Sequence, residues 1–234
     1  MIIRRAAEQC GQADYGWLQA RYTFSFGHYF DPQLLGYASL RVLNQEVLTP
    51  GSSFQPRTYP RVDILNIILQ GEVEYRGSDG LHVQAKEGDA LLLATQPNVS
   101  YSEHNISPAK PLTRMQLWLN ACPTRENSPL QRLTLNKSGH SLLASPEGEQ
   151  SSMQLRQQVW IHHLELQKNA QQAIKLNGNQ AYLQLIHGSM AVSSGHQHRG
   201  ETLYCGDGAF IQQETELTMQ AATPLRALLI DLVV

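Results

Sequence analysis

Histidine is suited both to metal binding and to proton transfer near neutral pH, and the chain has nine. His196 and His198 are two residues apart, so in a strand both imidazoles would point to one face, as two ligands of one metal ion must. A Ser-Ser-Gly segment precedes them and Arg-Gly follows, without an acidic or cysteine neighbour, which favours solvated histidines at a hairpin tip. His162 and His163 are adjacent, so in a strand they point to opposite faces and cannot chelate together. We expect these two on a strand surface.

Cys122 is the candidate for thiol chemistry. It follows an alternating apolar segment, precedes Pro123, and has Arg114 and Arg125 close to it in the sequence. A nearby guanidinium lowers the pKa of a thiol and favours the reactive thiolate. We therefore weigh an oxidisable, redox-sensing thiol at Cys122 against an inert, half-buried cysteine.

Other catalytic patterns are missing from the sequence. It has no Ser-His-Asp pattern, no Gly-x-Ser-x-Gly and no phosphate-binding loop. Glu46, Glu72 and Glu74 are not spaced as a carboxylate pair for acid–base chemistry. Hydrolase and kinase functions are therefore not favoured.

Short apolar or alternating runs, bounded by Gly, Pro, Asn and Asp, must position these side chains. They predict strands at residues 64–69, 73–75, 90–94, 115–119, 182–186, 209–211 and 226–234. Helical periodicity is rare, and residues 123–128 lose the strand pattern and resemble a linker. The sequence therefore predicts an all-β fold.

The two halves share a pattern of glycines. In the first half an apolar strand ends at Gly71 and a Gly-Asp turn follows at Gly88, 17 residues later. In the second half the corresponding glycines are Gly188 and Gly206, 18 residues apart. This repeat predicts a duplicated small β-barrel, and we place the two domains at residues 1–123 and 124–234.

Composition excludes several classes of protein. Among 234 residues, 18 are Lys or Arg and 20 are Asp or Glu, so the formal charge is -2 and long-range steering by charge is not expected. Three cysteines are too few and too odd a number for a disulfide scaffold, which indicates a reducing compartment. No run approaches the ~18 apolar residues of a membrane span, the start of the chain lacks the apolar core of a signal peptide, and no basic stripe suggests direct nucleic-acid binding. We expect a cytoplasmic protein.

Specific motifs support the barrel repeat. They are Phe24-Ser25-Phe26, Tyr29-Phe30-Asp31-Pro32, residues 40–44, 47–51 and 63–65 in the first half, and residues 181–183, 206–207 and 228–232 in the second. The strand–Gly–hairpin–Gly-Asp–strand unit resembles the cupin barrel, and the whole chain resembles the bicupins of the pirin family. This resemblance implies two tandem cupin domains.

The resemblance also implies a metal site that this sequence lacks. Metal-dependent pirins hold one divalent metal, usually iron, through three histidines and a glutamate of the N-terminal barrel. Counting from the motifs places these ligand positions at Arg57, Tyr59, Tyr101 and Glu103. All three histidines of the four-ligand set are therefore replaced, and only the carboxylate remains.

The replacements are poor metal ligands. Arginine has no lone pair to give and adds a positive charge, and a tyrosine must first lose a proton, at a cost of roughly 4 kcal/mol at pH 7. We therefore expect no cofactor, and we expect Arg57 to replace the charge of the metal by pairing with Glu103 and donating to an anion or a tyrosine oxygen. In the second barrel the equivalent positions fall at Ile174, Leu176, Met219 and Ala221, which predicts a structural role for that barrel.

Two further features lie near the segments expected to line the first cavity. His28 and His104 could provide a base or a substitute ligand, although a surface or rim position without a ligand role is favoured. Eight aromatic residues fall between residues 15 and 37. Packing of the barrel wall is favoured for them over a platform for a planar ligand.

The resulting functional hypothesis is a protein without a metal that binds a small anionic or phenolic molecule in the first barrel, or that responds to redox conditions. Arg57 would supply charge, Tyr59 and Tyr101 hydrogen bonds, and Glu103 the orientation of Arg57. The alternatives are metal-dependent quercetin 2,3-dioxygenase activity, which the resemblance implies but the missing histidines disfavour, and a protein-interaction or regulatory module, as in eukaryotic pirins that act as transcriptional co-regulators. We expect a monomer.

Overall fold

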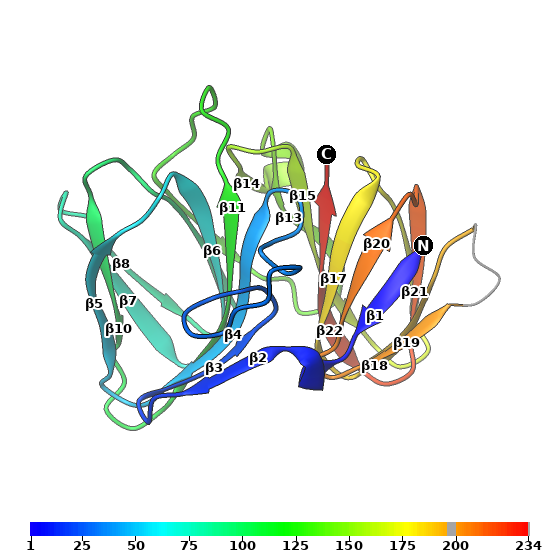
Figure 1. Ribbon diagram of the computed structural model, residues 1–234, viewed down its shortest axis with the longest axis horizontal. Coiled ribbons are helices and arrows are strands. Elements are labelled where there is room, and N and C mark those ends of the chain that lie inside the picture. The colour runs from blue at the N-terminus through cyan, green and yellow to red at the C-terminus, as the bar shows by residue number, and fades with distance from the viewer. Residues whose placement is uncertain (196–199, 234) are drawn as a thin grey trace. The chain divides into compact units, whose positions relative to one another are not determined.

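The structure is a computed structural model that describes residues 1–195 and 200–233. Within these residues it is built almost entirely from strands, with two short 3₁₀ helices, η1 (Ala7–Gln9) and η2 (Glu149–Ser151). The predicted all-β fold is confirmed. The chain forms two compact units, drawn in Figure 1. We call them the N-barrel (Gly11–Thr134) and the C-barrel (Met1–Cys10 together with the residues from Leu135 onward).

The N-barrel, all of whose residues are described, combines two antiparallel sheets. The seven-stranded sheet has the order β12-β9-β6-β11-β4-β3-β2, and the four-stranded sheet has the order β5-β10-β7-β8. The bounds are β2 (Gly11–Asp14), β3 (Leu18–Tyr22), β4 (Leu40–Leu48), β5 (Ser53–Thr58), β6 (Val62–Gln70), β7 (Glu72–Gly77), β8 (His82–Lys86), β9 (Asp89–Ala94), β10 (Ser100–Asn105), β11 (Leu112–Asn120) and β12 (Leu130–Thr134).

The C-barrel repeats this plan in its described residues. Its sheets have the orders β1-β20-β17-β22-β15-β13-β14 and β16-β21-β18-β19. The bounds are β1 (Ile2–Arg5), β13 (Gly139–Ser145), β14 (Met153–Gln154), β15 (Val159–Leu166), β16 (Gln171–Lys175), β17 (Gln180–His187), β18 (Ser189–Ser193), β19 (Glu201–Tyr204), β20 (Gly208–Gln212), β21 (Glu216–Ala221) and β22 (Leu225–Leu232). Each run predicted as a strand lies on one of these strands over its described residues, with 226–234 extending past the end of β22.

The glycine repeat has a conformational cause. Gly71, Gly88, Gly188 and Gly206 have φ values of 85°, 86°, 87° and 87°, in the left-handed region that favours glycine. At Gly71 a Cβ atom would also lie 2.5 Å from the carbonyl oxygen of Pro111. The same two turns therefore favour glycine in each barrel.

The boundary between the units differs from the sequence estimate, which placed it after residue 123. β12 follows residues 123–128 and pairs with β9 at the edge of the N-barrel sheet, whereas β1 pairs with β20 at the corresponding edge of the C-barrel sheet. Thus the first ten residues belong to the C-barrel and the boundary falls between Thr134 and Leu135. Pairing between segments about 200 residues apart leaves no local pattern in the sequence.

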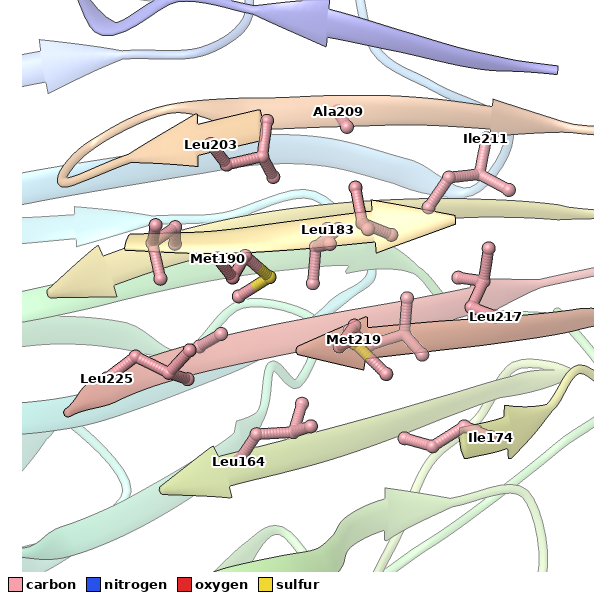
Figure 2. Close-up of a cluster of buried hydrophobic side chains, with 14 of the residues drawn as sticks. Leu164, Ile174, Leu183, Met190, Leu203, Ala209, Ile211, Leu217, Met219 and Leu225 are labelled. Atoms are coloured by element: carbon pink, nitrogen blue, oxygen red, sulfur yellow. The ribbon is translucent and has the colours of Figure 1, made fainter. Parts of the chain in front are cut away.

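The interior of the C-barrel is filled with hydrocarbon. Figure 2 shows Leu, Ile and Met side chains from strands on both sheets meeting in one cluster. The positions matched to the metal ligands belong to it: Ile174, Met219 and Ala221 are buried and Leu176 packs against it. Each fully buried Leu, Ile or Met contributes about 1.5–3 kcal/mol to burial free energy, so this interior stabilises the unit.

Two histidines of the C-barrel are more buried than expected. His162 and His163 were predicted on a strand surface, but they are 6% and 1% exposed, so that prediction is wrong. A ring nitrogen of His162 lies 2.9 Å from one of His140. Burial, with a smaller contribution from His140, lowers the pKa of His162 to about 4. Burial, with a smaller contribution from Arg226, lowers that of His163 to about 4.

Among the described residues, no helix is long and apolar enough to cross a membrane.

Candidate functional site

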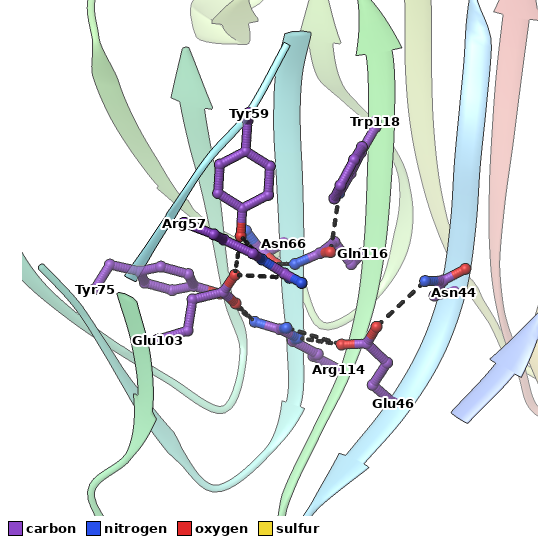
Figure 3. Close-up of polar contacts among 10 residues, drawn as sticks. All are labelled: Asn44, Glu46, Arg57, Tyr59, Asn66, Tyr75, Glu103, Arg114, Gln116 and Trp118. Atoms are coloured by element: carbon purple, nitrogen blue, oxygen red, sulfur yellow. Dashed lines mark hydrogen bonds and ion pairs between the residues drawn. The ribbon is translucent and has the colours of Figure 1, made fainter. Parts of the chain in front are cut away.

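The N-barrel holds a polar cluster on the inner wall of its larger sheet. β11 lies between β4 and β6, with Arg114 opposite Glu46 and Gln116 opposite both Asn44 and Asn66. Because alternate residues of a strand point to the same side, Arg114 and Gln116 enter the interior together. The smaller sheet contributes residues of β5, β7 and β10 from across the barrel (Figure 3).

Arg114 is the centre of the cluster, and its side chain is wholly buried. Its Nε and Nη2 donate to Oε2 of Glu46 at 3.0 and 2.8 Å. Its Nη1 donates to the Tyr75 hydroxyl at 2.7 Å and to Oε2 of Glu103. One guanidinium therefore joins a carboxylate of β4 to a carboxylate of β10.

Arg57 and Tyr59 form the more exposed end of the cluster. Nε of Arg57 donates to the Tyr59 hydroxyl at 2.7 Å, and that hydroxyl donates to Oε1 of Glu103 at 3.0 Å. The Arg57 side chain is 38% exposed, and its Nη2 lies 3.9 Å from Glu103. Its guanidinium also lies over the ring of Phe54, 4.9 Å from the centroid. Arg57 therefore contacts both the cluster and solvent.

The charges of the cluster balance, since two guanidinium groups face two carboxylates. Burial raises the pKa of Tyr59, and Glu103 raises it further. Burial likewise raises the pKa of Tyr75 well above its usual value. Burial alone would lower the pKa of Arg114, but Glu103 and its other partners outweigh this and raise it. At neutral pH both tyrosines are therefore uncharged and Arg114 is a permanent cation.

The predicted site residues separate into two groups. Arg57, Tyr59 and Glu103 meet as described, with the tyrosine oxygen accepting from Arg57. Tyr101, which was expected to supply a hydrogen bond to the same site, instead packs among the buried apolar residues of a neighbouring cluster. Its hydroxyl accepts from the backbone N–H of Gln96 at 3.3 Å, although its ring lies 6.2 Å from that of Tyr59.

Sequence reasoning missed Arg114, Glu46 and Tyr75. Glu46 was not recognised as one of a pair of carboxylates, because its partner Glu103 lies 57 positions away and on another sheet. The available signal was a charged residue at an inward position of two otherwise apolar strands. A buried charge of this kind requires a partner of opposite charge. Pairing β4 with β11 would have placed Glu46 opposite Arg114 and suggested that partner.

Arg114 also has no role beside Cys122, contrary to the sequence-based expectation, because its guanidinium is held inside the barrel. Sγ of Cys122 lies 3.3 Å from Oγ1 of Thr124. Hydrogen bonds from Thr124 are the main cause that lowers the pKa of the thiol, and Arg125 contributes less. The Cys122 side chain is half-buried.

The other candidate histidines lie apart from the cluster. His28 is exposed in the segment between β3 and β4, with its ring 6.3 Å from that of Tyr15. His104 makes a hydrogen bond of 2.9 Å with the Ser102 hydroxyl, on the face of β10 opposite to Glu103. His196 and His198 lie outside the described residues.

Over residues 1–195 and 200–233, no three His, Cys, Asp or Glu side chains are grouped so that they could hold a metal ion.

Comparisons with known proteins agree with this architecture. Residues 3–119 match the model of the family described as "Pirin", and residues 142–232 match the model described as "Quercetinase C-terminal cupin domain". The chain is 66% identical over 232 residues to the Pirin-like protein YhaK of Escherichia coli (strain K12), with 99% of each chain covered. It is 27% identical over 237 residues to the quercetin 2,3-dioxygenase of the same strain, again with 99% of each covered.

A solved structure shows the same fold. The crystal structure of the bacterial pirin YhhW from Escherichia coli in complex with nickel(II) aligns with a TM-score of 0.92 at 26% identity, and the alignment covers 100% of this chain and 99% of that one. Two barrels of this kind in one chain define a bicupin of the cupin superfamily. Within that superfamily, the domain matches and the 66% identity show that the chain belongs to the pirin family.

Proposed function

We propose that the N-barrel binds a small anionic or phenolic molecule beside Arg57 and Tyr59, without a metal ion. The observation that carries this proposal is the buried guanidinium of Arg114 between Glu46 and Glu103. Both carboxylates already have a cation, and that cation is part of the chain.

The donor chemistry of the cluster does not fit a divalent metal. Two guanidinium groups offer no lone pair, and the two nearby tyrosines keep their protons at neutral pH because burial raises the pKa of each. A divalent cation here would bring two more positive charges into a charge-balanced interior, where charge without a partner is costly. The cluster therefore offers a divalent metal no suitable set of ligands.

Arg57 is the group suited to meet a ligand. Its side chain reaches solvent and its contact with the Glu103 carboxylate is long, at 3.9 Å, so its outer N–H groups can donate to a ligand that arrives from solvent. A carboxylate or phenolate would accept from these groups, and charge-assisted bonds of this type are the stronger ones. Tyr59 lies beside it, with its ring 5.2 Å from that of Trp118, and offers an aromatic wall.

Two measurements test this proposal. Elemental analysis of protein purified without chelator or added metal should give well below one equivalent of iron, nickel or manganese. Calorimetric titration with benzoate and with phenol should show binding that Arg57→Ala weakens by about tenfold or more, as expected for loss of a charge-assisted hydrogen bond. The matched control is Arg41→Ala, since Arg41 is an exposed arginine of β4. Stoichiometric metal, or binding that is indifferent to Arg57, would contradict the proposal.

Quercetin 2,3-dioxygenase activity is the competing function, and its support is the relative of that name with 27% identity over the whole chain. The same preparations decide between the two. Flavonol-dependent oxygen uptake by the protein, with metal bound in stoichiometric amount, would favour the enzyme. We expect no uptake above the rate without protein.

A redox response of Cys122 is a second role that one observation favours. Hydrogen bonds from Thr124 lower the pKa of the thiol, and Cys122 is partly accessible. More thiolate at neutral pH favours oxidation to the sulfenic acid. We expect Cys122 to be oxidised by dilute peroxide before Cys10, which is also partly accessible, as peptide mass analysis after trapping with dimedone would show.

A further inference from the structure

The larger sheet of the N-barrel has a hollow on its outer face, the face opposite to the charged cluster. The volume of the hollow is about 460 Å³, within the usual range of roughly 300–1,000 Å³ for small-molecule sites. Its floor is formed by β2, β3 and β4, which lie side by side in Figure 1. The hollow therefore has the size of a binding site, and its side chains decide what it could bind.

Strand register determines which side chains form the floor. Ala20 faces the interior of the barrel, where it belongs to one cluster of buried residues with Leu18 and Tyr22. Because successive residues of a strand point to opposite sides, Arg21 points outward. Two outward rows cross the three strands, the first made of Gln12, Arg21 and Gln45 and the second of Asp14, Gln19 and Val47.

The first row presents three polar groups that are available to a ligand. Gln12 is exposed, and Arg21 and Gln45 are half-buried. Within the part of the chain that the structure describes, none of these three side chains has a hydrogen-bond or ion-pair partner. Neighbouring strands are only about 4.8 Å apart. One small molecule in the hollow can therefore contact all three side chains.

The chemistry of the first row selects the ligand. Arg21 can only donate, and its planar guanidinium matches the two oxygens of a carboxylate. Gln12 and Gln45 each donate and accept, as a hydroxyl group also does. A carboxylate whose carbon chain carries hydroxyl groups would therefore satisfy the arginine and both glutamines.

Asp14, in the second row, limits the charge of the ligand. Its carboxylate accepts from the backbone N–H of Gly16 at 2.8 Å and from Nε2 of Gln19 at 3.1 Å. Asp14 is diagonal to Arg21, and such positions on paired strands are roughly 7–8 Å apart. The carboxylate retains lone pairs for a hydroxyl group of the ligand, but it repels a second negative charge. The hollow therefore favours a monoanion.

We propose that this hollow binds a small hydroxylated monocarboxylate, with the carboxylate on Arg21 and the hydroxyl groups on the flanking glutamines. The site is separate from the one beside Arg57 and does not depend on it. D-Gluconate is the probe. Hexanoate has the same six carbons and the carboxylate but no hydroxyl group, and sorbitol has the hydroxyl groups but no carboxylate. These two molecules are the matched controls.

The test is calorimetric titration of the full chain at pH 8. Gluconate should bind about tenfold or more tightly than hexanoate, sorbitol or inorganic phosphate, which is a dianion at this pH. Arg21→Ala should weaken gluconate binding by about tenfold or more, and Arg21→Lys, which keeps the charge without the planar fork, should retain part of it. Gln45→Ala should weaken the binding of gluconate but not that of hexanoate. Arg41→Ala, at an exposed arginine of β4, is the control and should change neither.

The outcomes separate this inference from the proposed function. Gluconate binding that is absent at millimolar concentration, no tighter than that of either control, or unchanged in Arg21→Ala overturns the inference. Loss of gluconate binding in Arg57→Ala but not in Arg21→Ala assigns the ligand to the other site and also overturns it. Phosphate binding tighter than that of gluconate indicates a general anion site and overturns the proposed ligand class. Benzoate binding that depends on Arg57 is a separate result, so the proposed function can hold or fail independently.

Discussion

Replacing Arg114 by methionine removes a buried guanidinium and keeps an unbranched side chain of similar length. In the native protein that guanidinium contacts Glu46, Glu103 and Tyr75, and the carboxylate side chains are only 3% and 4% exposed. The variant leaves the buried Glu46 carboxylate without its cation, and leaves Glu103 with only the longer contact to Nη2 of Arg57, at 3.9 Å. Breaking a buried ion pair in this way costs about 3–5 kcal/mol, a large part of a typical total of about 5–15 kcal/mol.

The assay is denaturant unfolding followed by tryptophan fluorescence and by circular dichroism, because the two units need not unfold together. We expect a loss of about 4 kcal/mol at pH 8, equivalent to roughly 10–15 °C in melting temperature. Arg41→Met, at an exposed position of β4, is the matched control and should change stability by less than about 0.5 kcal/mol.

A second variant separates the charge of the cluster from its packing. Replacing Arg114 by methionine together with Glu46 and Glu103 by leucine removes all three charges at once, and such exchanges are often neutral or stabilising. We expect this triple variant to be more stable than Arg114→Met alone. A cost below about 1 kcal/mol for Arg114→Met, or no recovery in the triple variant, would refute the assignment of Arg114 as the internal counter-ion.

Three further predictions concern other parts of the chain. In the folded protein the pKa values of His162 and His163 are lowered from 6.5 to about 4. Their contribution to the stability of the C-barrel is therefore complete above pH 6.5 and is lost as the pH falls toward 4. Urea unfolding across this range should show a loss of at most about 3 kcal/mol for each histidine. Cys122 should react with iodoacetamide faster at pH 7 than a peptide thiol, and Thr124→Val should slow it, as mass spectrometry of quenched samples would show. Gly71→Ala should cost about 2 kcal/mol or more in denaturant unfolding, because its φ is 85° and a Cβ atom has no room.

Each of these has a control within the chain. Replacing both histidines by glutamine should flatten the pH dependence of unfolding between pH 6.5 and 4, and an unchanged slope would contradict their role. If iodoacetamide alkylates Cys122 no faster than it alkylates the peptide thiol, the prediction of an activated thiol is wrong. Gly88→Ala has the same backbone strain, with φ of 86°, but no atom within 4 Å of the new Cβ. Gly88→Ala should therefore lower the free energy of unfolding by less than Gly71→Ala does. An equal loss would contradict a role for the contact between the new Cβ atom and Pro111.

The site could be predicted only in part. Matching the family motif found Arg57, Tyr59 and Glu103 because they occupy fixed positions in a repeated unit. The same count included Tyr101, which packs among apolar residues with its hydroxyl on the Gln96 backbone. A position in a motif locates a backbone, but the direction of a hydroxyl depends on the side chains packed around it.

The interior of the N-barrel shows a similar limit. Asn44, Gln116 and Asn66 have no visible relation in the sequence, and they become a row only when β11 is inserted between β4 and β6. Burial of His162 and His163 was also missed, because adjacent residues of a strand can both be buried when each face of the sheet is covered.

The sequence by itself determined the all-β architecture and the duplication of the barrel, because strand alternation and glycines at left-handed turns are local properties of residues. It also led to the prediction that positions 57, 59 and 101 replace metal-binding histidines. Only the tertiary structure decided that Arg114 is the buried cation between Glu46 and Glu103, and that the first ten residues belong to the C-barrel. Each of these depends on strands that are distant in the sequence being brought side by side by hydrogen bonding and burial, and no local pattern specifies which strands those are.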